Sequence, residues 1–476
     1  MATLTGSTIA SSYEQLLSLP DGGGNGASLV AITDGDAGTT FCISITDAST
    51  GKAVLAVDGS HANGTEIQID NSATDGDAFL SFQLSGTSKF TMGVDDGDSD
   101  VFKIGTTAIG TGTMFVLDTS SNISLSNNDG GTSNTILGKL AGDDLASGGN
   151  YNIFLGEDAG HTNKLGDNNI AIGYDAMDLS YIDDTQDALT VDNIFIGHDA
   201  GGGDWATAAS HSNIGIGSAV LDDALNGALR NTAIGYGTFS NLTQADDSVA
   251  IGYYAGLNIT TGEANICIGS GSLDVATTAH YNVSIGTNAM GAVQAGQAIT
   301  EVIAIGHDAA YGGGSTTTGI DGTVAIGKDA LKAITTGGRN MAIGFETLTT
   351  AASQSHNIAI GYNALKDSSG TTSHRNIAIG SYSMDGVGSN IAADNVCLGY
   401  DTGTAITTGD NNIIIGSYAG DAIQDGHDNV IIGKGAATGS TALGSCVFIG
   451  YLAGGSDDIT ADADGTVAIG KSALNA

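Results

Sequence analysis

The sequence is short of the residues that anchor or cross-link a large globular core. Its 476 residues include one proline, one tryptophan, four cysteines and only 5% aromatic residues. The cysteines show neither disulfide nor metal-ligand spacing. Cys267 and Cys397 take a slot that alanine fills elsewhere, so we interpret them as small apolar residues, with a disulfide or a metal site as the alternative. Many small stacked units are therefore favoured over one large core.

Basic residues are also scarce. The chain has 13 Lys and Arg against 52 Asp and Glu, a formal net charge of −39. Nucleic acid and anionic membrane surfaces would repel it, so we expect neither as a partner. It has no run of eighteen apolar residues, and no basic segment followed by an apolar core at its N-terminus. We therefore expect no membrane insertion and no classical secretory signal, and folding in a cytoplasm.

What the chain has in abundance is glycine, and nineteen of its 74 glycines close copies of the string Asn-Ile-Ala-Ile-Gly. Half of the gaps between successive motif glycines share one length, the length from Gly156 to Gly173, and no gap is shorter. A period with a fixed minimum predicts a solenoid in which only the loops can grow. Nineteen coils spaced by ~4.8 Å predict a shaft of about 90 Å. The motif glycines are Gly138, Gly156, Gly173, Gly197, Gly217, Gly235, Gly252, Gly269, Gly286, Gly306, Gly327, Gly344, Gly361, Gly380, Gly399, Gly416, Gly433, Gly450 and Gly470.

Each position of the repeat suggests a role. The residues one and three before the glycine are mostly Ile, Val or Leu, and residues two apart on a strand share a face, so we predict that both point inward. Glycines such as Gly173, Gly252, Gly327, Gly361 and Gly416 would let the strand turn a corner. A small residue three later and an aliphatic residue seven later predict a second short strand, followed by a polar return loop.

Asparagine begins fourteen of the nineteen motifs, including Asn169, Asn265, Asn357 and Asn412. One amide at the same corner of every coil would form a ladder, in which each side chain bonds its neighbours above and below. We therefore predict a structural role for these asparagines.

The chain divides into three predicted regions. Residues 1–26 contain a helix at 7–19, ended by Pro20 and a glycine run, which we interpret as an attachment segment. Residues 27–132 form a β-rich module, a small sandwich or an intertwined prism, with strands at 28–32, 40–45, 53–57, 66–69, 79–84, 89–92, 101–104 and 115–117. Residues 133–476 form the repeat shaft. The predicted fold class is all-β.

The repeat resembles the head repeats of trimeric autotransporter adhesins, whose coils carry Ala-Ile-Gly followed by a small residue, and related repeats occur in bacteriophage tail fibres. The resemblance covers the nineteen copies and implies a left-handed parallel β-roll, intertwined as a homotrimer. The coils here are longer than the compact form of that repeat. A coil this short also buries little apolar surface of its own, which independently favours burial between chains.

A phage fibre is the closer of these two resemblances. A signal peptide, a coiled-coil stalk and a C-terminal membrane barrel, which an autotransporter adhesin needs, are not evident in the sequence. Residues 88–104 look similar to modules near the start of phage fibre proteins. The chain stops at Ala476, six residues after a motif glycine, which is consistent with a removed C-terminal chaperone. The resemblance implies a virion location and a baseplate or tail protein bound at the N-terminus.

Two clusters of acidic residues are the main candidate metal ligands. Asp96, Asp98 and Asp100 alternate with other residues, as do Asp462 and Asp464, but neither cluster matches a full calcium loop. Turn chemistry with solubility, or Ca²⁺ binding, would explain them; we expect no other cofactor. Paired aspartates and the two His-Asp pairs after motif glycines lack a nucleophile or a third ligand. We expect no catalytic residues and no enzymatic activity.

Aromatic residues are the candidate contacts for a receptor. Nine of the fourteen tyrosines closely follow a motif glycine, and stacked coils would bring them into an outer stripe. The stripe would be either a packing ladder or a platform for a sugar or a host surface protein. We select Tyr253, Tyr362 and Tyr400, together with Trp205 in a loop insertion, as candidate receptor contacts.

The sequence thus favours a non-enzymatic trimeric fibre, a phage tail fibre that attaches to a host glycan or protein. The alternative is a bacterial surface adhesin or a self-assembling extracellular filament, located at the cell surface or outside it. A polysaccharide-degrading enzyme is the least favoured hypothesis, because no set of residues supports it.

Overall fold

The computed structural model describes residues 46–47, 52–53, 69, 77–84, 87–95, 101–106, 113–117, 123–124 and 132–475, the last with gaps at 147, 181–189, 206–207, 294–298, 314–316, 369–372, 387–390 and 456–463. The chain divides into two units, Met1–Ile69 and Asp70–Ala476, which are described separately. The helix expected at 7–19 and the strands expected at 28–32 and 40–45 lie outside the described residues, as do all but one residue each of the strands expected at 53–57 and 66–69. The described part is all-β, and none of its segments is a helix that could span a membrane.

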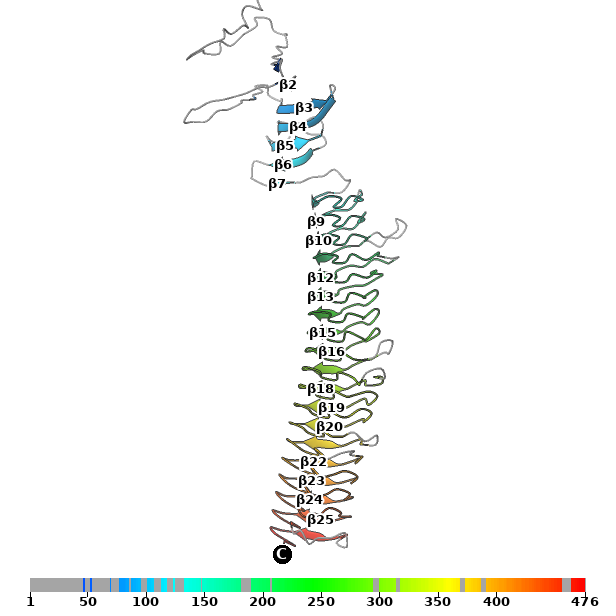
Figure 1. Ribbon diagram of the computed structural model, residues 1–476, viewed down its shortest axis with the longest axis vertical. Helices are drawn as coiled ribbons and strands as arrows, with labels where there is room; N and C mark the ends of the chain where they lie inside the picture. The colour runs from blue at the N-terminus through cyan, green and yellow to red at the C-terminus, as the bar shows by residue number, and fades with distance from the viewer. Residues whose placement is uncertain are drawn as a thin grey trace, which may run out of the picture. The chain divides into compact units, whose positions relative to one another are not determined.

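The first unit contains one described hairpin, and the second opens with a small antiparallel sheet. Strand β1 (Thr46–Asp47) pairs with β2 (Lys52–Ala53). The antiparallel sheet has five strands in sequential order, as Figure 1 shows. They are β3 (Ala78–Leu84), β4 (Thr87–Asp95), β5 (Val101–Gly105), β6 (Thr113–Leu117) and β7 (Ile123–Ser124). The Lys103 ammonium lies 2.7 Å from the Asp95 carboxylate, and both residues are buried in this sheet.

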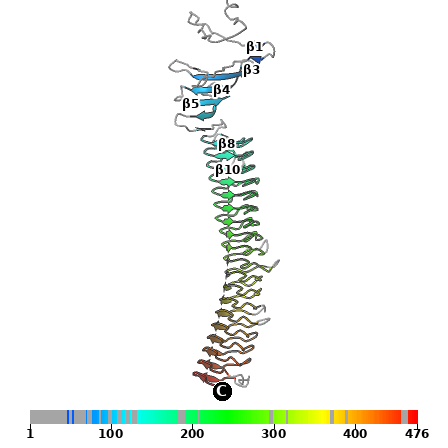
Figure 2. The same cartoon turned by 60° about the vertical axis from the view of Figure 1, so that its left-hand side comes forward.

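The repeats fold into a parallel β-solenoid with one three-residue strand for each motif. Strand follows strand along one side of the solenoid, and the loops project on the other (Figures 1 and 2). The strands are β8 (Thr135–Leu137), β9 (Ile153–Leu155), β10 (Ile170–Ile172), β11 (Ile194–Ile196), β12 (Ile214–Ile216), β13 (Thr232–Ile234), β14 (Val249–Ile251), β15 (Ile266–Ile268), β16 (Val283–Ile285), β17 (Ile303–Ile305), β18 (Val324–Ile326), β19 (Met341–Ile343), β20 (Ile358–Ile360), β21 (Ile377–Ile379), β22 (Val396–Leu398), β23 (Ile413–Ile415), β24 (Val430–Ile432), β25 (Val447–Ile449) and β26 (Val467–Ile469).

The register of this sheet does not change along the shaft. Ile358 pairs with Ile377, and Ile170 pairs with Ile194 although the longest gap between motif glycines lies between their strands. Loops therefore absorb every insertion, as the minimum period predicted. The nineteen predicted coils are confirmed as nineteen strands in one sheet.

The predicted direction of the strand side chains is wrong. In β9 to β26 the middle residue of each strand is buried, and the two flanking residues are half-buried or exposed. In β20, for example, Ala359 is fully buried while Ile358 and Ile360 lie on the outer surface of the sheet. The inside of the coil is narrow, and mostly small residues point into it.

The interior is completed by the residues three and seven after the glycine. In the coil of β14, Ala250, Ala255 and Ile259 are all fully buried. The buried Cys267 and Cys397 take the middle position of their strands, where burial raises the pKa of both thiols; they are free, as small core residues would be.

The predicted second strand is also wrong, because turns follow the motif glycine in the described coils. The residues two and four after the glycine adopt positive φ, for example Asn363 at 54° and Leu365 at 51°. Left-handed residues at alternate positions reverse the chain repeatedly and prevent an extended strand. Gly361 itself has a φ of 134°, and a Cβ placed there would lie 2.6 Å from the carbonyl carbon and oxygen of Gly380 in the next coil. The motif glycine is thus required both by its φ and by the close contact with the next coil.

Asparagines link the coils as predicted. The Asn376 Oδ1 accepts the backbone N–H of Asn395 at 3.1 Å and its side-chain Nδ2–H at 3.2 Å, while its own Nδ2 donates to the Ala392 carbonyl at 2.8 Å. Asn169, Asn265, Asn357 and Asn412 are fully buried and occupy equivalent places. The ladder satisfies polar groups that a narrow coil would otherwise bury without partners.

Candidate functional surfaces

The outer surface of the parallel sheet carries two rows of aliphatic side chains, which we call the sheet face. The rows consist of the first and third residues of strands β8 to β26, and all of these are Ile, Val, Leu or Met except Thr135 and Thr232. Their exposure in the described chain is moderate along the shaft, for example 38% for Ile251 and 37% for Ile303. Exposed apolar patches on single soluble chains rarely exceed a few hundred Å². Two rows that continue over nineteen strands are typical of a surface that another chain covers.

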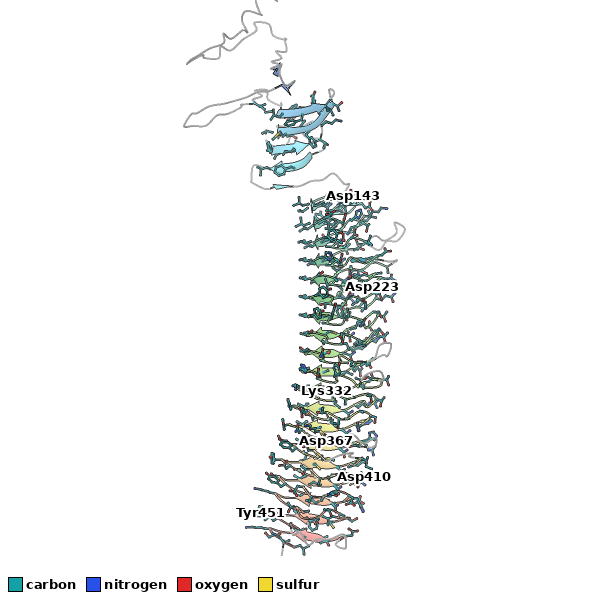
Figure 3. All side chains as sticks on the ribbon, viewed as in Figure 1. Asp143, Asp223, Lys332, Asp367, Asp410 and Tyr451 are labelled. Carbon is teal, nitrogen blue, oxygen red and sulfur yellow. The ribbon has the colours of Figure 1, made fainter. Side chains whose placement is uncertain are left out.

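Charge is confined to the other sides of the shaft. Neither row of the sheet face contains an acidic or basic residue, whereas loop residues such as Asp223 and Asp410 lie away from the strands in the view of Figure 3. The solenoid is therefore amphipathic along its whole length. This separation of charge from apolar surface permits side-by-side association despite a net charge of −39.

An aromatic row runs along the corner that follows the strands. It consists of Phe345, Tyr362, Tyr382, Tyr400 and Tyr418, one ring from each of the five coils of β19 to β23. Neighbouring ring centroids are 5.5, 5.2, 6.1 and 5.4 Å apart. Four of the five residues are 38–45% exposed, and Tyr382 is half-buried. The outer stripe expected of the tyrosines is thus present in this segment.

A second aromatic cluster lies nearer the N-terminal end of the shaft. The Tyr253 ring stacks on Tyr236 at 5.6 Å and touches Tyr254 at 4.2 Å, and Tyr253 is 54% exposed. Tyr362 and Tyr400, the other two tyrosines selected from the sequence, belong to the aromatic row. All three present rings to the surface, which leaves both the packing and the binding interpretations open.

Trp205 is a core residue and lacks the exposure that a receptor contact requires. Only 1% of it is exposed, its Nε1–H donates to the Gly201 carbonyl at 3.1 Å, and its ring packs edge-on against Phe195 at 5.6 Å. A lone tryptophan in a loop insertion was expected to lie outside. Here the loop folds back, and the ring closes the coil interior beside a phenylalanine.

A hollow of about 250 Å³ adjoins the middle of the aromatic row. Its lining includes Tyr382, Asp385, Asp401 and Thr404, from the loops that follow β21 and β22. Burial, reinforced by the negative charge of Asp367, raises the pKa of Asp385 to about 6. The Asp385 Oδ1 has no hydrogen-bond partner in the described part of the chain. The sequence analysis missed this site although its residues stand at repeated positions: Tyr382 and Asp401 lie two residues, and Asp385 and Thr404 five residues, after a motif glycine.

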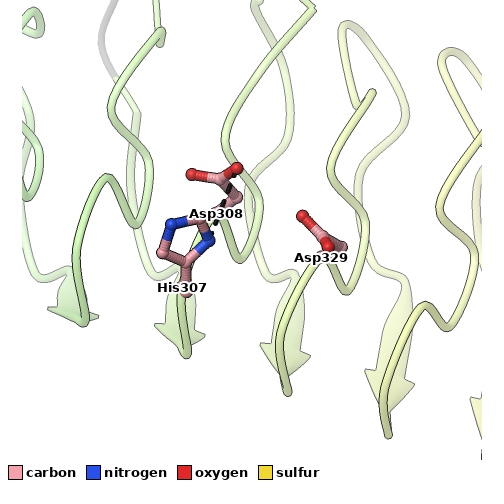
Figure 4. Close-up of side chains that lie close together, drawn as sticks. All are labelled: His307, Asp308 and Asp329. Carbon is pink, nitrogen blue, oxygen red and sulfur yellow. Dashed lines mark ion pairs between the residues drawn. The ribbon is translucent and has the colours of Figure 1, made fainter.

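His307, Asp308 and Asp329 form one compact cluster, whose ligand atoms lie within 4.8 Å of one another (Figure 4). The cluster already contains its counter-charges. The Lys332 ammonium is 2.8 Å from both carboxylates, and the Lys328 ammonium is 2.8 Å from Asp329. Burial tends to raise the pKa of Asp329, but the hydrogen bonds from the two lysines outweigh it and lower that pKa. We interpret the cluster as an ion-pair network between adjacent coils.

The acidic residues selected as metal ligands are only partly described. Asp96, Asp98, Asp100 and Asp462 lie outside the described residues. Asp464 is described, and its Oδ1 accepts the backbone N–H of Gly444 at 2.6 Å. That bond links two adjacent coils and does not test either explanation, so turn chemistry and Ca²⁺ binding both stay predictions.

Comparisons of the chain with models of protein families, with curated proteins and with solved structures found no match.

Proposed function

We propose that this chain is a non-enzymatic structural fibre protein, a bacteriophage tail fibre whose shafts associate side by side as a homotrimer and serve in host attachment. The sheet face is the single observation that carries the assembly part. Covering a long row of half-exposed isoleucines with another apolar surface is favourable in water, and a second and a third copy of the same face supply that surface. The resemblance to trimeric head repeats favours three chains over two.

The virion location and the attachment of a tail protein at the N-terminus remain parts of this proposal. The acidic surface and the repetitive shaft support it, because a rod whose core repeats from coil to coil holds distant ends apart. A self-assembling filament or a cell-surface adhesin is the alternative, and it uses the same shaft.

Light scattering of the purified full chain tests the assembly. We expect one species near three times 47.2 kDa. Dissociation of the trimer on addition of EDTA would favour Ca²⁺ binding by the acidic clusters. Open-ended polymers would favour the filament, and a stable monomer would contradict the proposal.

A variant of the sheet face makes the test specific. Ile251→Asp combined with Ile268→Asp places two charges on the sheet face, in the row formed by the third residue of each strand, without changing the coil interior. We therefore expect trimers to dissociate while the circular dichroism of the sheet is retained. Gln244→Asp, at an exposed loop position, is the matched control and should stay trimeric. A double variant that remains trimeric would place the interface elsewhere.

The attachment part needs its own measurement. An excess of the purified fibre should compete with adsorption of the phage that encodes it to its host cells. Unchanged adsorption, with the trimer intact, would contradict attachment and leave a purely structural rod.

A further inference from the structure

We propose that the aromatic row and the hollow beside Tyr382 bind a non-acidic polysaccharide that lies along the shaft. The inference rests on the proposed attachment function and names the chemistry of the surface that the fibre would hold. Three features of the described residues carry it: the rings, the acceptors without donors, and the sign of the charge.

The rings form a linear row, in which Phe345 and Tyr362 are stacked and the later neighbours meet edge to face. They come from five successive coils, so the row runs parallel to the shaft axis, with centroid separations of 5.2–6.1 Å. Sugar rings present apolar C–H faces, which pack against aromatic rings, and the tyrosine hydroxyls supply polar contacts at the edge. A repeated platform of this kind suits a polymer of similar units better than one small molecule.

The hollow offers hydrogen-bond acceptors without matching donors. The Asp385 carboxylate lines it and has one oxygen without a partner among the described residues. Rotation of the Asp385 carboxylate exchanges its two oxygens, so either can accept. A chain of hydroxyl groups provides O–H donors, and a hydrogen bond from a hydroxyl to an ionised carboxylate is stronger than one between two neutral groups.

The charge excludes acidic glycans. Two carboxylates, Asp385 and Asp401, line the hollow, and its described lining contains no basic side chain. The nearby Lys366 is paired with Glu346, at 2.6 Å between the charged groups. A uronate, sialate or phosphate group would therefore meet repulsion there, whereas neutral and amino sugars would not.

The row is also separate from the sheet face. Its residues follow the motif glycine, after the chain has turned the corner, whereas the sheet-face residues precede it. Packing of chains through the two aliphatic rows of the sheet face therefore does not explain the exposed rings, which could still bind a ligand in the assembled fibre.

Affinity electrophoresis of the full chain tests the proposal. The native gels contain dextran, yeast mannan, hydroxyethyl cellulose or chitosan oligomers as non-acidic probes, and alginate or hyaluronate as acidic ones. We expect at least one non-acidic gel to retard the protein and neither acidic gel to do so. Combining Tyr382→Ala with Tyr400→Ala should weaken the apparent binding by about tenfold or more, since two stacking rings are lost. Asp385→Asn should weaken it less, because the amide keeps one acceptor oxygen.

Tyr451→Ala is the matched control, since Tyr451 follows a motif glycine and is 47% exposed, but lies outside the aromatic row. Retardation by no non-acidic polysaccharide, or retardation that the double variant leaves unchanged, would overturn the inference. So would loss of the trimer in the double variant, because the rings would then be packing contacts between chains. Light scattering of the same samples separates the two proposals: a monomer that still binds removes the trimeric assembly alone, and a trimer that does not bind removes the inference alone.

Discussion

Single residues in this shaft are constrained by the next coil along the chain as much as by their own coil. At Gly361 an added Cβ would meet the Gly380 carbonyl group, and the φ of 134° disfavours any side chain. We expect Gly361→Ala to lower the free energy of unfolding by about 3 kcal/mol, from strain and overlap together.

Gly470→Ala is the control for this substitution. Its φ is 130°, but no atom lies within 4 Å of the added carbon, so only the strain of about 1–2 kcal/mol should remain. Thermal melts followed by circular dichroism compare the two variants. Equal shifts of Tm would show that contact with the next coil contributes nothing.

Two half-buried carboxyls predict a pH dependence of stability. Burial raises the pKa of Asp274 and of Asp385 to about 6, above the ordinary 3.8. Between these pH values the folded chain binds more protons than the unfolded chain, so the free energy of unfolding should fall as pH rises from about 4 to 6.

Replacing both carboxyls tests this dependence. Asp274→Asn with Asp385→Asn should flatten the pH profile and stabilise the protein at pH 7 by about 1 kcal/mol for each site, after solvent screening is allowed for. Asp425→Asn, which removes one exposed charge, is the control. The free energy of unfolding is measured by urea melts at pH 4.5 and at pH 7. If its difference between the two pH values is the same in the double variant as in the parent protein, the assignment is contradicted. Asp247 and Asp394, whose pKa values their arginine partners lower, act in the opposite sense and lose their contribution only as pH falls below about 4.

The residue-level errors of the sequence analysis have a physical origin. A period of two shows that Ile358 and Ile360 share a face, but not which face is the interior. Bulk and hydrophobicity were taken to mean inside, whereas the narrow coil accepts Ala359 and leaves the larger side chains outside. The small volume of the middle residue of the strand in most copies was the feature that indicated which face points into the coil.

Between elements, the asparagine ladder replaces much of what longer strands would provide. Asn376→Ala would remove the acceptor of the buried Asn395 N–H, together with a donor to the Ala392 carbonyl, and leave that N–H unpaired. We expect the free energy of unfolding to fall by about 3 kcal/mol, measured by urea denaturation.

Thr323→Ala provides the comparison at the same position of another coil. The ladder is interrupted there, and the buried Thr323 Oγ1 has no partner in the described residues. Its removal should cost less than about 1 kcal/mol. A similar loss for both variants would mean that the amide ladder is not the source of the stability.

The form of each coil could be only half predicted. The strand and its corner follow from the Ile-Gly pattern, but Leu365 at a φ of 51° follows no residue preference that a sequence shows. Asparagine at the residue two after the glycine, as in Asn363, tolerates that conformation and was the available signal for a turn in place of a second strand.

For the whole molecule, the number of motifs should set the length. Deleting residues 236–286 removes three successive coils of the minimum length and joins Gly235 to the chain that follows Gly286. We expect a folded shaft shorter by about 14 Å, as seen by electron microscopy or solution scattering.

A deletion that breaks the period is the control. Removing residues 236–278 leaves too few residues before Gly286 to complete a coil, so that variant should melt at a lower temperature or aggregate. Equal behaviour of the two deletions would contradict a fixed coil.

The aromatic row and its hollow illustrate what escapes prediction at this scale. The clustering of tyrosines after the glycine was visible in the sequence, and the stacking of coils turned it into a continuous stripe. The hollow lies between the loops of two adjacent coils. Asp385 and Thr404 both stand five residues after a motif glycine, but the residue type at that position varies from coil to coil, so the position did not indicate a site.

The unbroken register across the longest insertion separates two properties that most proteins couple. Ile170 and Ile194 pair as the strands of the shortest coils do, although the loop between them is the longest between any two motifs. The number of motifs thus sets the length of the shaft, and the sequences of the intervening loops set the chemical character of its surface. Such a rod can change the side chains that it presents by exchanging a loop without changing its length, and it can be lengthened or shortened by whole coils without altering the loops that remain.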